Sequence, residues 1–338
     1  DMIQIFGLFQ LATISRGAAL SDGSRYPYLC RTSPSLMFVA DGISKLLQVL
    51  GWTKVASVQD TKGLSMSTVR DFKVAVRTAV GEGYPFNEDY ISMHSYSIDE
   101  RNFFSADVVR ALQKGDVRVF IVAVYEDVGA RLYCEMFRNH FYGKHVQSIL
   151  ALSWWGDTWI AEQVKEQGVS LPCTAGEIFR AAGGMLSFGQ TAFLASSSRH
   201  EITGAVLNDI KNAYISACSA PGAEGCHVDF ASYDYDGLAV MAKAFHVWLY
   251  EQGHNLTDFD YDNPEPQREL YEIVKGMTFT GVTGSVAFFN ETNLDCERKG
   301  FFSLRQLRFL AQVGGDPGWA EITSFTNQDG FATETAWA

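Results

Sequence analysis

Residues 117–125 read VRVFIVAVY, and this stretch decides the fold class. Apart from Arg118 it is apolar throughout, and it has the length of a strand rather than the ~18–20 residues that cross a bilayer. A half-buried strand would alternate apolar and polar residues. A near-continuous apolar run is typical of a strand buried on both faces, as in the middle of a parallel sheet.

Helical and strand patterns alternate on both sides of this run. Helices are expected over 104–112 and 128–141, and another buried strand over 146–152. The same alternation continues outward, with strands at 11–15, 55–58 and 90–96 and helices at 39–52, 69–80, 204–217, 235–252 and 267–277. Strands that alternate with helices at this spacing predict an α/β fold with parallel sheets.

The C-terminal part has a different pattern. Segments 286–289, 301–313 and 321–325 predict strands in a meander. The length of 338 residues suggests two domains. Because no repeat, low-complexity segment or long linker separates two halves, we expect two lobes joined by several strand crossings.

Charge and composition exclude some classes of function. The chain has 27 Lys and Arg against 39 Asp and Glu, a formal net charge of -12. Nucleic-acid binders and basic membrane-surface modules need concentrated positive charge, so the sequence argues against both. The N-terminal DMIQIF lacks the basic region and cleavage site of a signal peptide. We expect either that a signal was removed or that the chain begins inside a larger protein.

Cysteines and glycosylation sequons favour an oxidising, secretory compartment. Cys218 and Cys226 bracket the small-residue stretch SAPGAEG, which predicts a loop closed by a local disulfide. Two Asn-X-Ser/Thr sequons begin at Asn255 and Asn290, beside turn-forming or polar residues where a glycan would meet no core.

Enzyme motifs are weak. The sequence contains neither GxGxxG nor GxxxxGK[ST], and its seven histidines form no HExxH pair. The segment GMLSFG at 184–189 is one residue longer than a GxSxG nucleophile elbow, so a hydrolase using Ser187 is a minor reading beside a plain strand. We expect no enzyme activity, no catalytic residue and no cofactor.

An acidic segment allows a weak metal hypothesis. Four acids stand at positions 1, 3, 5 and 12 of an EF-hand calcium loop: Asp258, Asp260, Asp262 and Glu269. However, Asn263 stands where the sharp turn wants glycine, and two prolines restrict the path. A solvated acidic loop before a helix is the favoured reading, and no metal is expected.

Two segments carry a family resemblance. Residues 17–35, GAALSDGSRYPYLCRTSPS, resemble a signature of the receptor-type periplasmic-binding-protein fold, G…ALSD…RYP…FRT.PS. In that family the signature precedes a helix and then GW.KVA, and here LGWTKVA follows at 50–56.

Further segments narrow the match. VYEDVGARLYCE at 124–135, YGK at 142–144 and LSWWGDTW at 152–159 are similar to the metabotropic gamma-aminobutyrate (GABA-B) receptor ectodomain. FTGVTG at 279–284, followed by VAF at 286–288, matches the family's F.GV.G.V.F turn into a strand. The motifs occur in the family's order and cover nearly the whole chain.

The resemblance implies a two-lobed Venus flytrap, the type I periplasmic-binding-protein fold, which closes on a small ligand. By this analogy lobe 1 holds residues 1–52 and 198–279, lobe 2 holds 53–197 and 280–326, and 327–338 form a tail. The family's first lobe opens with strands that precede this segment. We therefore expect lobe 1 to lack its N-terminal strands, as in a fragment, a partly built chain, or a chain completed by another one.

In lobe 2 the resemblance places Tyr125 and Trp154 at positions that line the ligand cleft. Aromatic faces there suit amine or aliphatic ligand groups. The alternative is that both rings are strand-end core.

In lobe 1 the ligand residues depart from the family. The turn GAAL at Gly17 is shorter than the family's serine-rich turn and has no hydroxyl, and Ser33 replaces a cleft histidine of the gamma-aminobutyrate receptor. Phe230 stands at the position of the amine-binding acid, with Asp229 beside it. A zwitterion needs charge-assisted partners at both ends, so gamma-aminobutyrate itself is not expected to be a strong ligand.

The resemblance also implies a disulfide between Cys134 and Cys173. Cys30 and Cys296 then remain, and three outcomes are open for them. They could pair with residues outside the chain, pair with a partner chain, or stay buried and free.

The functional expectation is an extracellular or secretory-lumen receptor domain, the ectodomain of a membrane protein. It would close on a small polar or amino-acid-like ligand and pass the closure to a protein partner, an oligomer or an attached membrane domain outside this chain. The alternative is a flytrap fold kept as a structural or assembly subunit with no ligand. No nucleic-acid partner is expected.

Overall fold

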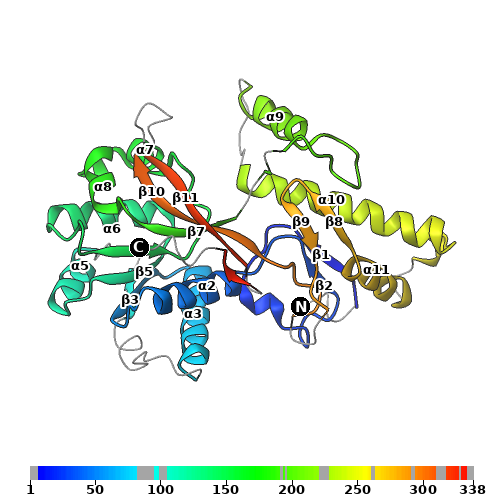
Figure 1. The fold of residues 1–338 in the computed structure, drawn as a ribbon, viewed down its shortest axis with the longest axis horizontal. Coiled ribbons are helices and arrows are strands. Elements are labelled where there is room, and N and C mark those ends of the chain that lie inside the picture. Colours follow the sequence, from blue (N-terminus) through cyan, green and yellow to red (C-terminus); the bar gives the residue numbers. More distant parts are fainter. Residues whose placement is uncertain are drawn as a thin grey trace. The chain divides into compact units, whose positions relative to one another are not determined.

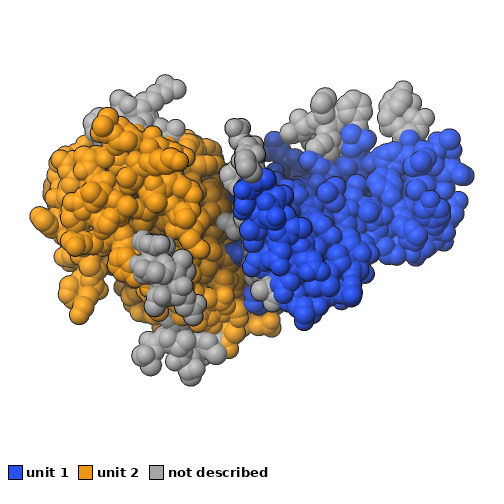
Figure 2. All heavy atoms as spheres, turned by 90° about the horizontal axis from the view of Figure 1, so that it is seen from above, with its two compact units in different colours: residues 1–35, 190–301 blue, residues 36–189, 302–338 orange. Residues whose placement is uncertain are grey.

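The computed structural model describes residues 7–81, 95–98, 105–190, 193–194, 196–220, 228–259, 263–290, 294–309, 317–326 and 329–332. The chain divides into two compact units, coloured separately in Figure 2. Unit 1 comprises residues 1–35 and 190–301, and unit 2 comprises residues 36–189 and 302–338. The units are therefore interleaved along the chain, which passes between them at 35/36, 189/190 and 301/302.

Over its described residues, unit 2 is built on an eight-stranded mixed sheet in the order β12-β11-β10-β7-β6-β5-β3-β4. Figure 1 labels β3, β5, β7, β10 and β11 of this sheet. Its strands β3 to β7 run parallel, whereas β11 and β12 pair antiparallel. The strands are β3 (Val55–Asp60), β4 (Ser95–Ile98), β5 (Val119–Ala123), β6 (Gln147–Leu150), β7 (Leu186–Gln190), β10 (Phe301–Phe309), β11 (Pro317–Thr326) and β12 (Gly330–Phe331).

Strand β5 is buried on both faces, as the VRVFIVAVY run predicts. Phe120 and Val122 point into the larger core, which is formed with residues of α5, α6, α7 and α8. Val119, Ile121 and Ala123 alternate with them and are also buried. These helices are α5 (Ser105–Lys114), α6 (Glu126–Arg138), α7 (Trp159–Gln167) and α8 (Ala175–Ala182), with the short η2 (Gly168–Ser170) between the last two.

The helices α2 (Leu36–Val49) and α3 (Gly63–Gly81) pack on each other. Helix α2 lies against the sheet at Gly42, where a Cβ atom would come within 2.8 Å of the Phe188 ring and 3.1 Å of the Phe325 ring. Only glycine permits so close an approach of the helix backbone to strands β7 and β11. Helix α2 therefore belongs to unit 2.

In the part of unit 1 that the structure describes, there are two small sheets. The strands β1 (Gln10–Ala12) and β2 (Leu29–Arg31) pair in parallel, and β8 (Thr278–Gly281) and β9 (Gly284–Ala287) form an antiparallel hairpin. Their apolar residues share a core with the helices α10 and α11. The helical segments are η1 (Ala18–Ser21), α9 (Leu207–Cys218), α10 (Val228–His246), the π-helical η3 (Val247–Glu251), η4 (Leu256–Asp258) and α11 (Glu265–Lys275).

The structure confirms the α/β class, and it differs from the sequence-based expectations in the proposed meander and in several elements that were not expected. The expected strand at 286–289 is not part of a C-terminal meander, because β9 pairs with β8 in unit 1 while β10 and β11 lie in the sheet of unit 2. Strand β2 and the helices α7 and α8 have no counterpart among the expected elements. The first part of the expected strand at 90–96 lies outside the described residues.

The bounds of the units also differ from those of the expected lobes. The family analogy places residues 36–52 in lobe 1, and 190–197 and 280–301 in lobe 2. The structure places the first range in unit 2 and the other two in unit 1. Helix α2 packs on the sheet of unit 2 through Gly42. The β8–β9 hairpin is one hydrogen-bonded element, so a division at 279/280 would cut through it.

Candidate functional site

An aromatic pair lies at the carboxyl edge of the parallel sheet of unit 2. Tyr125 follows β5 and immediately precedes α6, and Trp154 follows β6. Their ring centroids are 5.5 Å apart with an interplanar angle of 63°, an edge-to-face contact. Ligands of parallel α/β sheets bind at this edge, where the loops after neighbouring strands converge. The structure thus brings together the two residues that the resemblance places in lobe 2.

Two further residues join this pair and are missed by the sequence reasoning. Asp60, the last residue of β3, is fully buried and accepts a hydrogen bond from the backbone N–H of Tyr125 at 2.9 Å. Its other oxygen accepts from the backbone N–H of Lys62 at 3.0 Å. The Nζ atom of Lys62 lies 3.9 Å from the centroid of the Tyr125 ring. A carboxylate two residues after the strand predicted at 55–58, followed two residues later by a lysine, is the signal that could have identified them.

Glu126, the first residue of α6, is a further acid at this edge. Burial raises its pKa, and the negative charge of Asp127 raises it further. A hydrogen bond with its own backbone, another with the Trp154 side chain, and the positive charge of Lys62 lower the pKa and offset part of that rise. A carboxyl group whose charged form is disfavoured by burial beside an aromatic pair is typical of a binding or catalytic edge rather than of open surface.

In unit 1 the predicted residues Gly17 and Ser33 lie on either side of strand β2. Gly17 precedes η1, and its carbonyl accepts a hydrogen bond from Arg31 at 2.9 Å. Ser33 follows β2 and is only 1% exposed. Its hydroxyl has no hydrogen-bond partner among the residues that the structure describes. Buried hydroxyls are normally satisfied, so this one is a candidate for contact with a ligand or an ordered water.

Arg31 determines the shape of the turn that contains Gly17. Its guanidinium pairs with Glu297, donates to the Ser21 hydroxyl at 2.5 Å and donates to the carbonyls of Gly17 and, at 3.4 Å, Ser15. Sequence reasoning included Arg31 in a motif without assigning it a role. Its partner Glu297 lies 266 residues away, so only the fold brings them together.

Helix α10 carries the expected acid, Asp229, and a second acid, Asp236, whose contacts the structure shows. Asp229 lies in α10, and its side chain is outside the described part of the chain. Asp236, two turns further along, is fully buried and accepts hydrogen bonds from the backbone N–H groups of Val282 at 2.8 Å and Thr283 at 3.1 Å. It also contacts His200 Nε2 at 3.2 Å. Asp236 therefore fixes the β8–β9 turn and is engaged by the protein itself.

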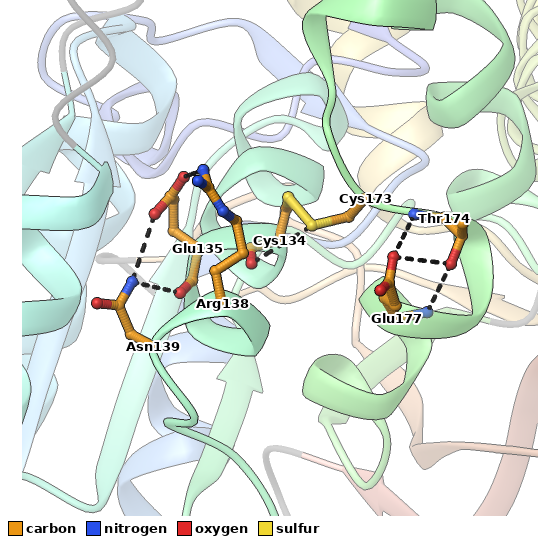
Figure 3. The surroundings of a disulfide bond; sticks show 7 residues. All are labelled: Cys134, Glu135, Arg138, Asn139, Cys173, Thr174 and Glu177. Atoms are coloured by element: carbon orange, nitrogen blue, oxygen red, sulfur yellow. Dashed lines mark hydrogen bonds and ion pairs between the residues drawn. A yellow bond between two sulfur atoms is a disulfide. The ribbon is translucent and has the colours of Figure 1, made fainter.

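The structure contains the Cys134–Cys173 disulfide that the resemblance implies (Figure 3). Cys173 directly precedes Thr174, which begins α8 through a capping box with Glu177, so the bond ties α6 to the start of α8. The bond therefore holds the start of α8 next to α6.

The other cysteines require one correction. Cys30 and Cys296 pair with each other, so the three alternatives left open for them are all wrong. Strand β2 and the segment after β9 adjoin each other, which brings the two Cα atoms to 4.8 Å. Cys218 is disulfide-bonded, and its expected partner Cys226 lies outside the described residues.

The calcium hypothesis loses two of its four ligands to other partners. Asp258 accepts a hydrogen bond from the backbone N–H of Asn255, and Glu269 accepts one from the Trp248 indole and lies 3.4 Å from His254. The other two acids, at positions 260 and 262, lie outside the described residues. The residues that the structure describes contain no cluster of acids, histidines or cysteines able to hold a metal ion.

The remaining predicted positions are placed as follows. Both sequon asparagines, Asn255 and Asn290, are exposed. Ser187 is buried in the middle of β7, where it pairs with Leu150, rather than at the strand-to-helix turn that a nucleophile elbow requires. Over the described residues, no helix is both long and apolar enough to cross a membrane.

Comparison with known proteins gives a consistent result. Residues 2–296 match the family model described as the receptor family ligand binding region. The chain is 25% identical to mouse gamma-aminobutyric acid type B receptor subunit 1 over 298 residues, 85% of this chain and 28% of that protein. It is 26% identical to human subunit 2 over 322 residues, 93% of this chain and 31% of that protein. A Caenorhabditis elegans subunit 1 is 23% identical over 340 residues, 96% of this chain and 35% of that protein. The chain spans about a third of the length of these relatives.

Proposed function

Because this chain belongs to the receptor family ligand binding region, we propose that it is the extracellular ligand-binding domain of a receptor. It closes on a small polar or amino-acid-like molecule and transmits the closure to a partner or to a membrane domain. The observation that carries the proposal is the cluster of Tyr125, Trp154, Asp60 and Lys62 at the carboxyl edge of a parallel sheet. Such an edge combines the apolar surface and the few polar groups that small-ligand sites use.

Units 1 and 2 would be the two lobes of the flytrap. Gly17 and Ser33 would supply the ligand contacts of unit 1, and the buried, unpaired hydroxyl of Ser33 supports that assignment. Asp229 is proposed as a further contact on the strength of its place at the start of α10. Ligand binding would then be coupled to a hinge motion at the three places where the chain passes between the units.

The proposed ligand is not gamma-aminobutyrate, although the relatives are named for it. The turn at Gly17 carries alanines where a hydroxyl would be needed, and Phe230 stands where the family analogy expects an acid. A zwitterion without a charged partner at each end loses the stronger, charge-assisted hydrogen bonds. Titration calorimetry that gave micromolar binding of gamma-aminobutyrate would contradict this proposal.

The cell-surface setting is proposed on two observations. Disulfides join Cys30 to Cys296 and Cys134 to Cys173, and such bonds persist in oxidising compartments. Both sequons are exposed, so glycans at Asn255 and Asn290 would be tolerated. A protein partner or oligomer, and a membrane domain in the rest of the receptor, complete the proposal.

The experiment is a ligand screen with matched variants. Thermal unfolding of the wild-type chain is measured with a panel of amino acids, small carboxylates and small amines, and each hit is titrated by calorimetry. Tyr125→Ala and Trp154→Ala should each weaken binding about tenfold or more, since aromatic anchors of a small-ligand site dominate its affinity. The control is Tyr250→Ala, an aromatic residue of unit 1 that is 77% exposed and outside the site.

Two results would contradict the proposal. One is the absence of any ligand-dependent shift across the panel, which would favour a flytrap fold used only for assembly. The other is a ligand whose affinity is unchanged in both site variants.

A further inference from the structure

The Tyr125 ring already has a cation on its face. The Nζ atom of Lys62 lies 3.9 Å from the ring centroid, well inside the ~6 Å within which an ammonium is attracted to an aromatic ring. A ligand ammonium that approached this aromatic pair would seek the same position. Lys62 and such a ligand would therefore compete for one face of one ring.

The position of Lys62 is set by the fold rather than by a flexible surface chain. Asp60 is fully buried and accepts hydrogen bonds from the backbones of both Tyr125 and Lys62. One carboxylate thereby fixes the start of the lysine side chain beside the ring that it covers. Trp154 packs edge-to-face on Tyr125 and holds the ring in place.

The ammonium end of Lys62 faces acids of α6: its charge lowers the pKa of Glu126, and it pairs with Asp127. Its Nζ lies 3.8 Å from Asp127 Oδ1, and the two side chains are 33% and 45% exposed. An ion pair with that exposure is screened by water and contributes little. The backbone of Lys62 is therefore fixed beside the ring, whereas its exposed ammonium group can leave the ring face.

We propose that Lys62 is a built-in occupant of the cation-binding face of Tyr125. This half of the ligand site then excludes ammonium groups and accepts ligands that present an uncharged or acidic group to the aromatic pair. The inference rests on the proposed function, since it assigns the ligand chemistry of that same site.

The test uses tetramethylammonium chloride as the probe, titrated into the full chain at constant ionic strength. Binding is followed by the NMR chemical shifts of the aromatic rings. Lys62→Ala should bind tetramethylammonium about twofold to thirtyfold more tightly than the wild type, the range that a cation–aromatic contact provides. Lys62→Arg keeps a cation over the ring and should bind like the wild type. The double variant Lys62→Ala, Tyr125→Ala should lose the gain.

Lys45→Ala is the matched control for charge. Lys45 is a half-exposed lysine of the same unit that also lies over a ring, 5.5 Å from the Phe325 centroid, and also faces an aspartate. Its removal changes the net charge equally and should produce no gain, because the Phe325 ring is fully buried and closed to the probe. The inference is overturned if Lys62→Ala binds the probe no more tightly than the wild type, or if Lys45→Ala gains as much. A failed screen for natural ligands leaves this difference measurable, so the two proposals fail separately.

Discussion

Replacing Glu297 by Gln tests the ion pair that supports the Gly17 turn. Arg31 and Glu297 pair with side-chain exposures of 0% and 4%, so water screens neither charge. The Arg31 Nε atom donates to both carboxylate oxygens, at 2.9 and 3.0 Å. The substitution keeps the shape of the side chain but removes its negative charge. Arg31 would then be a buried cation without a counterion.

The magnitude follows from that uncompensated charge. Breaking a buried ion pair by removing one partner costs about 3–5 kcal/mol. The remaining contacts of Arg31, to Ser21 and to two backbone carbonyls, are to neutral acceptors and cannot replace a carboxylate. By the same reasoning the double variant Arg31→Met, Glu297→Leu should recover most of the loss, since it removes both charges of the pair.

The assay is hydrogen exchange of the backbone amides in residues 17–32, measured by mass spectrometry under non-reducing conditions. Protection there reports the free energy of local opening. The adjoining Cys30–Cys296 disulfide keeps the two segments close, so the loss should appear as faster exchange rather than as separation. Asp107→Asn serves as the control, because it breaks an exposed pair with Arg110 and should change stability by less than about 1 kcal/mol. A Glu297→Gln protein whose opening free energy lies within about 1 kcal/mol of the wild-type value would refute the reasoning.

Three further predictions concern packing, pH and modification. Gly129→Ala should destabilise unit 2 by about 1–3 kcal/mol in thermal or urea unfolding, because its Cβ would lie 2.2 Å from the Trp155 ring, whereas Gly176→Ala in α8 meets no atom within 4 Å and should be neutral. Burial raises the pKa of Glu126, so its contribution to stability is present at acid pH and is lost as pH rises through its folded-state pKa. Glu126→Gln should therefore reduce the fall in melting temperature between pH 4 and pH 7, measured by calorimetry. An unchanged fall would contradict the assignment. The two exposed sequons should carry glycans when the chain is secreted from eukaryotic cells, seen as a loss of mass on enzymatic deglycosylation that disappears when both asparagines are replaced by glutamine.

The sequence predicts the central sheet well because the signal is local. The run at 117–125 is apolar on both faces of a strand, and only a sheet covered on both sides buries such a strand. The helices on either side carry apolar residues at helical spacing, so α5 and α6 are expected within a few residues of their observed bounds. Short elements such as β2 carry too few residues for periodicity to separate a strand from a loop.

The aromatic half of the candidate site follows from the resemblance, whereas its polar half does not. Tyr125 and Trp154 stand in recognisable motifs, and the structure places their rings in contact. Asp60 and Lys62 belong to a different strand and its loop, and nothing in their local sequence states which ring they meet. Their role depends on the order of β3 beside β5, which is a property of the sheet.

The sequence by itself determined the α/β class, the family and the Cys134–Cys173 bond, because each depends on local patterns or on motifs in a fixed order. Only the tertiary structure decided that Cys30 joins Cys296, that Arg31 meets Glu297, and that a lysine covers the Tyr125 ring. The first two contacts join segments 266 residues apart, and no periodicity along the chain encodes such a distance. They form because burying the apolar faces of strands and helices brings distant segments together, and the side chains at those meeting points then pair as their charge and chemistry allow.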